Sequence, residues 1–132
     1  MSLDVRVIAP NKVIWDKKAE EVILPSQSGM LGILTSHAPL YTALNTGVMK
    51  VRNETGWTSI VVMGGFVEVE KNEVLVLVNA GEYVDEIDIS TAKKDVEKAL
   101  ETFNSAEAPK EKEEAAEFLK YAQARLKAVV DK

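Results

Sequence analysis

The spacing of apolar residues changes once along this chain, near residue 88. Before that point the sequence consists of short segments rich in Val and Ile, and several of them alternate apolar with polar residues. After it, apolar residues recur at steps of three and four. Alternation is typical of β-strands with one buried face, and steps of three and four are typical of amphipathic helices. The sequence therefore predicts a β-rich N-terminal part followed by a helical C-terminal part.

Short strands dominate the first part. Turn-forming residues such as Pro10-Asn11 and Lys71-Asn72 separate them. No helical segment lies between them, so a parallel sheet is not expected, and the pattern favours an antiparallel sandwich or flattened barrel. Gly64-Gly65 is expected to form a tight hairpin or bulge. The predicted strands cover 3–9, 12–16, 20–25, 31–34, 48–53, 58–64, 66–70 and 73–79.

Two helices with one apolar face each are predicted after residue 88. Asp88 and Ser90 are both suitable N-caps for the first, because their side-chain oxygens can accept hydrogen bonds from first-turn amides. Pro109, within 104–112, interrupts the helical pattern. We expect an antiparallel hairpin. Its apolar positions are Ile89, Ala92, Val96, Leu100 and Phe103 in the first helix and Ala115, Phe118, Leu119, Ala122, Leu126, Val129 and Val130 in the second.

The apolar faces of this hairpin are narrow and rich in alanine. At about 25 cal/mol per Å² of buried apolar surface, their pairing contributes little beyond the entropy cost of ordering the helices. The hairpin is therefore expected to gain stability by docking elsewhere. It could be a permanent subdomain or a module that can leave its docking site.

Composition and charge exclude several classes of protein. With 132 residues the chain is long enough for one domain, or for one core and a small appendage. Its net charge of -5, without a clustered basic surface, argues against nucleic-acid binding. No apolar run approaches the roughly 20 residues that cross a bilayer, and the N-terminus lacks the features of a secretory signal. Because there is no cysteine, disulfides and thiolate chemistry are excluded.

The sequence offers little for catalysis. Its one histidine, His37, lies in an apolar stretch beside Ser36 and Ala38-Pro39, where a rigid, partly exposed turn is expected. A structural role, contact with a partner and catalysis all remain open for this residue. An enzyme is not expected, because the chain has no metal-ligand cluster, nucleophile turn or phosphate-binding glycine loop. An interaction subunit and a ligand-sensing module remain.

The stretch around the histidine carries a more specific signal. Its residues are Gly29, Leu31, Gly32, Ile33, Leu34, His37, Ala38, Pro39 and Leu40. Together with "MGGFVEVEKNEVLVLVN" they resemble the epsilon subunit of F-type ATP synthases, and the similarity runs the length of the chain. "VILPS" and "TALNTGVMKVR" are similar to cyanobacterial and plastid members. The resemblance implies an antiparallel ten-stranded β-sandwich at 1–87 and a two-helix hairpin at 88–132.

The resemblance also implies a function. Such a subunit is non-catalytic and lies at the foot of the rotating central stalk, beside the gamma subunit and against the c-ring. The catalytic alpha/beta hexamer is a further partner. The subunit couples ring rotation to the stalk, and in many bacteria its hairpin extends to block ATP hydrolysis. The implied location is peripheral, on the cytoplasmic or stromal face of an energy-transducing membrane, with the thylakoid favoured.

Two sets of contact residues follow from the resemblance. Met30 stands where many relatives carry an acidic residue, so an apolar contact rather than a salt bridge is expected there. Contact with the c-ring is expected at Gly29, Met30, Leu31, His37, Ala38 and Pro39. Contact with gamma is expected at Ala9, Tyr41 and Thr42.

Nucleotide binding is where the chain departs from some bacterial relatives. Those relatives bind ATP through an I/L-D-x-x-R-A motif and two arginines of the second helix. Here Thr91 and Tyr121 replace two of the three arginines. Lost guanidiniums remove bidentate partners for phosphate, so neither tight ATP binding nor a cofactor is expected. The positions that match the nucleotide site are Ile87, Asp88, Ala92 and Arg125.

Two alternatives to a rotor subunit remain. They are a nucleotide-sensing module and an adaptor of an unrelated complex.

Overall fold

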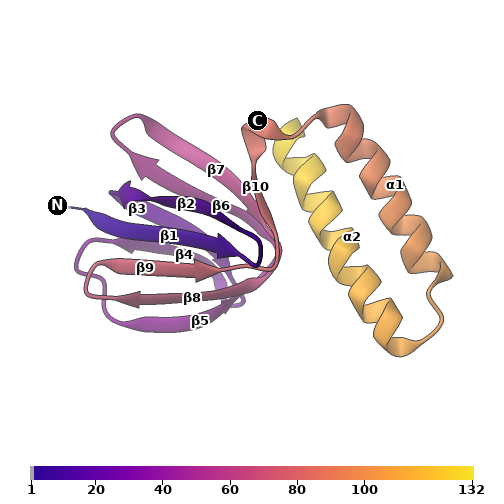
Figure 1. Ribbon diagram of the computed structural model, residues 1–132, viewed down its shortest axis with the longest axis horizontal. Helices are drawn as coiled ribbons and strands as arrows, with labels where there is room; N and C mark the ends of the chain where they lie inside the picture. The colour runs from indigo at the N-terminus through magenta and orange to yellow at the C-terminus, as the bar shows by residue number, and fades with distance from the viewer. Residues whose placement is uncertain (1) are drawn as a thin grey trace.

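The computed structural model describes residues 2–132. A β-sandwich is followed by a helical hairpin that stands at one end of it (Figure 1), which confirms the predicted order of strands and helices. The elements are β1 (Leu3–Ala9), β2 (Lys12–Ala19), β3 (Glu21–Ser26), β4 (Gly29–Leu34), β5 (Leu40–Leu44), β6 (Gly47–Asn53), β7 (Gly56–Val62), β8 (Gly65–Glu70), β9 (Glu73–Leu77), β10 (Gly81–Tyr83), the 3-10 helix η1 (Val84–Glu86), α1 (Ile89–Ser105) and α2 (Pro109–Val130).

One continuous ten-stranded sheet folds over on itself to make the two layers of the sandwich. The strand order is β10-β7-β6-β3-β5-β8-β9-β1-β2, with β4 paired to β3 beside this path. β3 joins the layers, because residues 21–23 pair with β6 whereas Ser26 pairs with β5. The ten strands implied by the resemblance are therefore confirmed.

Pairing within residues 2–132 is antiparallel except between β1 and β9, which run parallel from Asp4 opposite Glu73 to Ile8 opposite Leu77. The predicted antiparallel sandwich is confirmed, with this one parallel pair inside it. A parallel neighbour usually needs a crossover helix. Here β2 to β8 carry the chain from the end of β1 back to the start of β9, so no helix is needed.

Two strands and one connection differ from the predictions. β5 and β10 lie outside the predicted strands, and β10 is too short, with three residues, for alternation to reveal it. Gly64-Gly65 does not form a hairpin, because β7 pairs with β6 and β10 whereas β8 pairs with β5 and β9. Gly65 has φ +118°, and a Cβ added there would lie 1.9 Å from the Leu77 carbonyl oxygen. A glycine is therefore required for β8 to approach β9.

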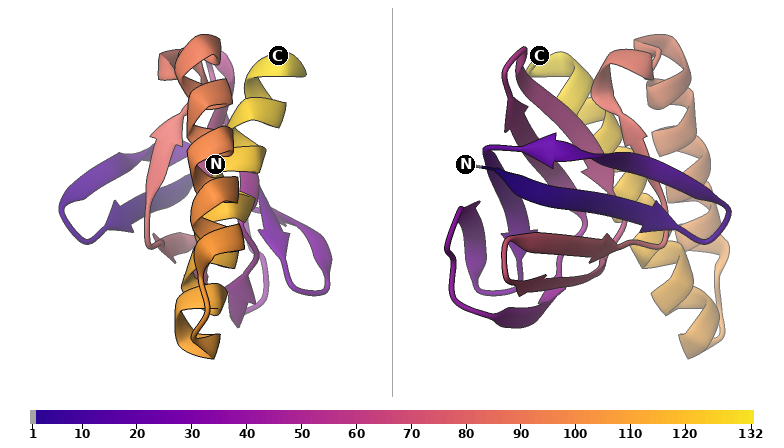
Figure 2. Two further views of the ribbon diagram at one scale, coloured as in Figure 1. Left: turned by 90° about the vertical axis from the view of Figure 1, so that its right-hand side faces the viewer. Right: turned by 60° about the vertical axis from the view of Figure 1, so that its left-hand side comes forward.

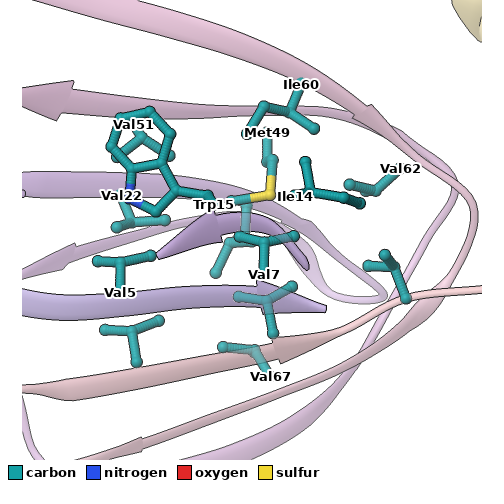
Figure 3. Close-up of a cluster of buried hydrophobic side chains, with 14 of the residues drawn as sticks. Val5, Val7, Ile14, Trp15, Val22, Met49, Val51, Ile60, Val62 and Val67 are labelled. Atoms are coloured by element: carbon teal, nitrogen blue, oxygen red, sulfur yellow. The ribbon is translucent and has the colours of Figure 1, made fainter. Parts of the chain in front are cut away.

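The core fills the space between the two layers. Figure 3 shows Val7 and Val67 below Met49 and Ile60, with side chains from both layers pointing toward one another. These four side chains are fully buried, and Trp15 is 4% exposed. The Trp15 indole donates a hydrogen bond to the Lys17 carbonyl at 3.1 Å, so its one polar atom has a partner. This rigid block positions the loops at both ends.

The hairpin begins and turns through residues with local structural reasons. The Asp88 carboxylate accepts hydrogen bonds from the Thr91 amide at 2.9 Å and hydroxyl at 3.0 Å. These bonds lower the pKa of Asp88 and confirm it as the N-cap of α1. Pro109 starts α2, where its missing N–H costs nothing, so the connection covers only 106–108 rather than 104–112.

The hairpin lies against the sandwich through α2, which contacts β6, β7 and η1 (Figure 2). Within α1 and α2 the buried side chains are all alanines, namely Ala92, Ala115 and Ala122. Leu100 and Phe118, predicted on the apolar faces, are 45% and 60% exposed. Helices that meet at alanines approach closely and leave larger side chains at the edge of the contact. The docking expected for so thin a hairpin is confirmed.

Candidate functional site

The loop between β4 and β5 holds the histidine at the end of the sandwich away from the hairpin. The side-chain oxygen of Asn72, in the β8–β9 turn, accepts a hydrogen bond from the Ser36 amide at 2.6 Å. The Asn72 carbonyl also accepts from an amide of β1 at 2.8 Å. His37 Nδ1 donates to the Ala38 carbonyl at 2.6 Å, so Nε2 is the ring nitrogen that this hydrogen bond leaves free. The loop is therefore preformed and partly exposed.

The other half of the expected ring contact, residues 29–31, lies at the opposite end of β4. They form the first half of the strand, whose six residues span about 17 Å from Gly29 to Leu34. Met30 is 64% exposed and borders a groove lined by Pro25 and by Lys127 and Ala128 of α2. The structure therefore does not bring 29–31 and 37–39 into one surface.

An exposed apolar row crosses five strands on the outer face of the sandwich. Its members are directly opposite one another in the register: Ala43 faces Phe66, Phe66 faces Leu77, Leu77 faces Ile8, and Ile8 faces Val13. Phe66, Leu77 and Val13 are 47%, 48% and 57% exposed. Large exposed apolar patches of this kind mark interaction sites in folded proteins. We call Ala43, Phe66, Leu77, Ile8 and Val13 the outer apolar row.

Of the three residues expected to contact gamma, Tyr41 alone presents a largely exposed side chain, at 68%. Its ring stacks on Phe66 with centroids 5.7 Å apart, so it extends the outer apolar row. Thr42 lies opposite the buried Val67 and therefore turns toward the core. Ala9 is 8% exposed at the end of β1. The Tyr41 side chain thus faces outward, whereas Thr42 turns toward the core and Ala9 is buried.

Arg125, the one arginine retained from the nucleotide motif, is engaged by carboxylates of the protein. Its Nη1 donates to Asp95 at 2.7 Å, and Nε makes an ionic contact of 2.5 Å with Glu82. The Tyr121 hydroxyl donates to Glu82 at 3.1 Å. Burial alone lowers the pKa of Arg125, but hydrogen bonds to Asp95 and Glu82 raise it overall, so the guanidinium stays charged. Burial and the Glu82 charge raise the pKa of Tyr121, which therefore remains a donor.

The other matching positions of the nucleotide motif have structural roles. Ile87 and Ala92 are 7% and 0% exposed and belong to a small apolar cluster with Val61 and Val84, between sandwich and hairpin. Asp88 caps α1. These positions, with Arg125, therefore lie where the hairpin starts and meets the sandwich.

Among residues 2–132, His, Asp and Glu side chains form no group of three or more that could hold a metal ion. Neither helix in that range is long and apolar enough to cross a membrane.

Comparisons with known proteins decide the family. A model described as "ATP synthase, Delta/Epsilon chain, beta-sandwich domain" matches residues 2–84. The chain is 96% identical over 132 residues to the ATP synthase epsilon chain of the cyanelle of Cyanophora paradoxa, with 100% of both chains covered. The chain belongs to the ATP synthase epsilon family. It is therefore a non-catalytic subunit of an F-type ATP synthase, and it is peripheral to the energy-transducing membrane that holds the complex.

Other epsilon relatives agree over the full length. The epsilon chain of Trichodesmium erythraeum is 55% identical over 131 residues, which cover 97% of this chain and 96% of that one. The fold matches a chain in the cryo-EM structure of Euglena gracilis mitochondrial ATP synthase with a TM-score of 0.80 at 20% identity. That match covers 98% of this chain and 81% of the other. The epsilon fold thus includes the hairpin as well as the sandwich.

Two features of this epsilon chain were not found from sequence. One is the outer apolar row, although a signal for it exists: Phe66 is in phase with Glu68 and Glu70 and so must lie on the outer face. The other is the pair of carboxylates on Arg125. Glu82 and Asp95 lie 43 and 30 residues before it, and no local pattern marks them.

Proposed function

We propose that the chain is the rotor subunit that couples c-ring rotation to the catalytic head of the ATP synthase. In this proposal the sandwich, residues 1–87, binds gamma and the c-ring, and the hairpin, residues 88–132, regulates ATP hydrolysis. The alpha/beta hexamer is the partner on which that regulation acts. The proposal rests on family membership and on the distribution of exposed apolar side chains.

The outer apolar row carries the gamma contact in this proposal. The side chains of Phe66, Leu77 and Val13 are each about half exposed, on a face that the hairpin does not cover. Burial of such an apolar surface under a partner is favourable, because it removes the apolar side chains from water. Tyr41 stacks on the row and widens it. We therefore assign gamma to this face, with Tyr41 as the member of the expected gamma set that contributes its side chain.

The c-ring contact is proposed at the β4–β5 loop. His37, Ala38 and Pro39 are held there by the hydrogen bond between Ser36 and Asn72, so little conformational entropy is lost on docking. Gly29, Met30 and Leu31 remain a second proposed contact at the other end of β4. The two ends of one strand cannot both face a flat ring that meets the sandwich from one side.

Separate alanine variants distinguish these two ends. We expect His37→Ala to weaken binding to isolated c-ring about fivefold or more, because it removes a partly exposed ring from a preformed loop. Met30→Ala should leave binding within about twofold. Binding can be measured by surface plasmon resonance with detergent-solubilised ring. The opposite ranking would move the ring contact to residues 29–31, and no effect from either variant would remove both.

Similar chains support a proposal about location. They include those of a cyanelle, of Trichodesmium erythraeum and of the chloroplast of Porphyra purpurea. We propose a position at the thylakoid membrane, on the stromal or cytoplasmic face where the catalytic head lies. The subunit is held there through the complex.

Reconstitution tests the regulatory half of the proposal. ATP hydrolysis is measured for a catalytic complex lacking epsilon, after addition of buffer, the full chain, or a truncation that ends at Ile87. We expect both proteins to bind through the sandwich and only the full chain to lower the hydrolysis rate. Equal inhibition would assign the effect to the sandwich and the gamma contact. Absence of binding by both proteins would contradict the rotor assignment itself.

A further inference from the structure

One guanidinium joins the three elements that meet where the hairpin touches the sandwich. Arg125 projects from α2, Glu82 belongs to β10, and Asp95 belongs to α1. The contacts are 2.5 Å to Glu82 and 2.7 Å to Asp95. Figure 1 shows β10 at the end of the sandwich that faces α2, so this junction lies where the hairpin docks. Separation of either helix from the sandwich must break at least one of these contacts.

The rest of the docking surface combines an apolar cluster with one exposed ion pair. Its apolar part consists of Val61, Val84, Ile87 and Ala92 with partly buried neighbours. One more ion pair crosses the same boundary, between Lys132 and Asp85 at 3.0 Å, but its side chains are 51% and 84% exposed. Exposed pairs of this kind contribute little. The Arg125 side chain is 14% exposed, so its contacts are screened far less.

The cluster is also complete without a ligand. Two carboxylates surround one guanidinium, and the Tyr121 hydroxyl donates to the Glu82 carboxylate. The formal charge of Glu82, Asp95 and Arg125 together is negative, which repels a triphosphate. Nothing in this arrangement needs a nucleotide to neutralise it.

We infer that Glu82, Arg125 and Asp95 form a latch that holds the hairpin against the sandwich without any nucleotide. The latch deepens the regulation proposed for the hairpin, since extension of the helices requires it to open. It concerns the isolated chain, so its test does not depend on the rotor assignment. Because Arg125 serves both helices, its loss frees α1 and α2 together.

Amide hydrogen exchange of the full-length chain tests the latch. A hairpin whose buried residues are alanines is marginal once undocked, so its amides report opening directly. We expect Arg125→Gln to speed exchange in α1 and α2 about tenfold or more, as loss of charged, partly buried hydrogen bonds implies. Strands β1 and β9 should keep their exchange rates. Glu82→Gln should act in the same way.

Three controls decide the outcome. Lys132→Ala removes the exposed ion pair across the same boundary and should change exchange by less than about twofold. The double variant Glu82→Gln/Arg125→Gln should exchange no faster than the faster single variant, because both break one cluster. Millimolar ATP should leave exchange of the unaltered chain unchanged. The latch is rejected if Arg125→Gln behaves like Lys132→Ala, if β1 and β9 lose protection equally, or if ATP slows exchange of the hairpin.

Discussion

The double substitution Phe66→Glu/Leu77→Glu is expected to lower the affinity for gamma at least about a hundredfold, the loss typical of two central contacts at a protein interface. Both side chains lie in the middle of the outer apolar row, one opposite the other on β8 and β9. Two carboxylates there would be buried without partners when gamma binds, and desolvation of an unpaired charge is costly. The fold itself should tolerate the change, because both positions are about half exposed and Glu68 and Glu70 already occupy the same face of β8.

Trp57→Glu is the matched control. Trp57 is also 48% exposed, but it lies on β7, in the other layer of the sandwich. We expect this variant to bind gamma like the unaltered chain when measured by isothermal titration calorimetry. Circular dichroism should show a cooperative thermal transition for all three proteins, somewhat lower for the double variant because its two carboxylates lie opposite each other. If Trp57→Glu weakens binding as strongly as the double variant, or if the double variant binds normally, gamma does not sit on the outer apolar row.

The substitution Gly65→Ala is expected to lower the free energy of unfolding by about 3–5 kcal/mol, from a strained positive φ together with overpacking. The backbone at Gly65 has φ +118°, a region that residues with a Cβ rarely adopt. The added Cβ would lie 1.9 Å from the Leu77 carbonyl oxygen and 2.9 Å from the Val78 Cα, so β8 and β9 must move apart. A loss of that size lowers the melting temperature by more than about 10 °C in a domain of this length.

Two other glycines separate the causes. Gly56 has φ +115° but no atom within 4 Å of an added Cβ, so Gly56→Ala tests backbone strain alone and should cost about 1–2 kcal/mol. Gly32 lacks both features, and Gly32→Ala should change stability by less than about 0.5 kcal/mol. Thermal and urea unfolding followed by circular dichroism give the three values. A Gly65→Ala variant no less stable than Gly56→Ala would show that β8 and β9 accommodate the side chain.

Most of the fold could be predicted because it follows from local pattern. Alternation locates most of the strands, and the change of spacing near residue 88 locates the hairpin, whose first helix is capped by Asp88 as predicted. Local pattern does not determine which strands are neighbours. The parallel pair of β1 and β9 depends on how the whole sheet closes, and residues 4 and 73 carry no mark of their pairing.

The contact surfaces were harder to predict than the fold. The family motif groups residues 29–31 with 37–39 because they are close in sequence, but an extended β4 places them at opposite ends of the sandwich. Arg125 has the appearance of a ligand in sequence and is an ion-pair partner in the structure. In both cases the missing information is distance in space between residues that lie on different elements.

The pairing of β1 with β9 also bears on how the chain folds as it is synthesised. Strand β1 leaves the ribosome before the other nine strands, yet its second neighbour, β9, starts at residue 73. Until then β1 has only β2 beside it, and its other edge remains open to aggregation. Contacts of such long sequence separation slow folding, whereas a helical hairpin forms from local contacts. Closure of the sandwich is therefore expected to be the slow step, with the helices joining a finished sandwich last.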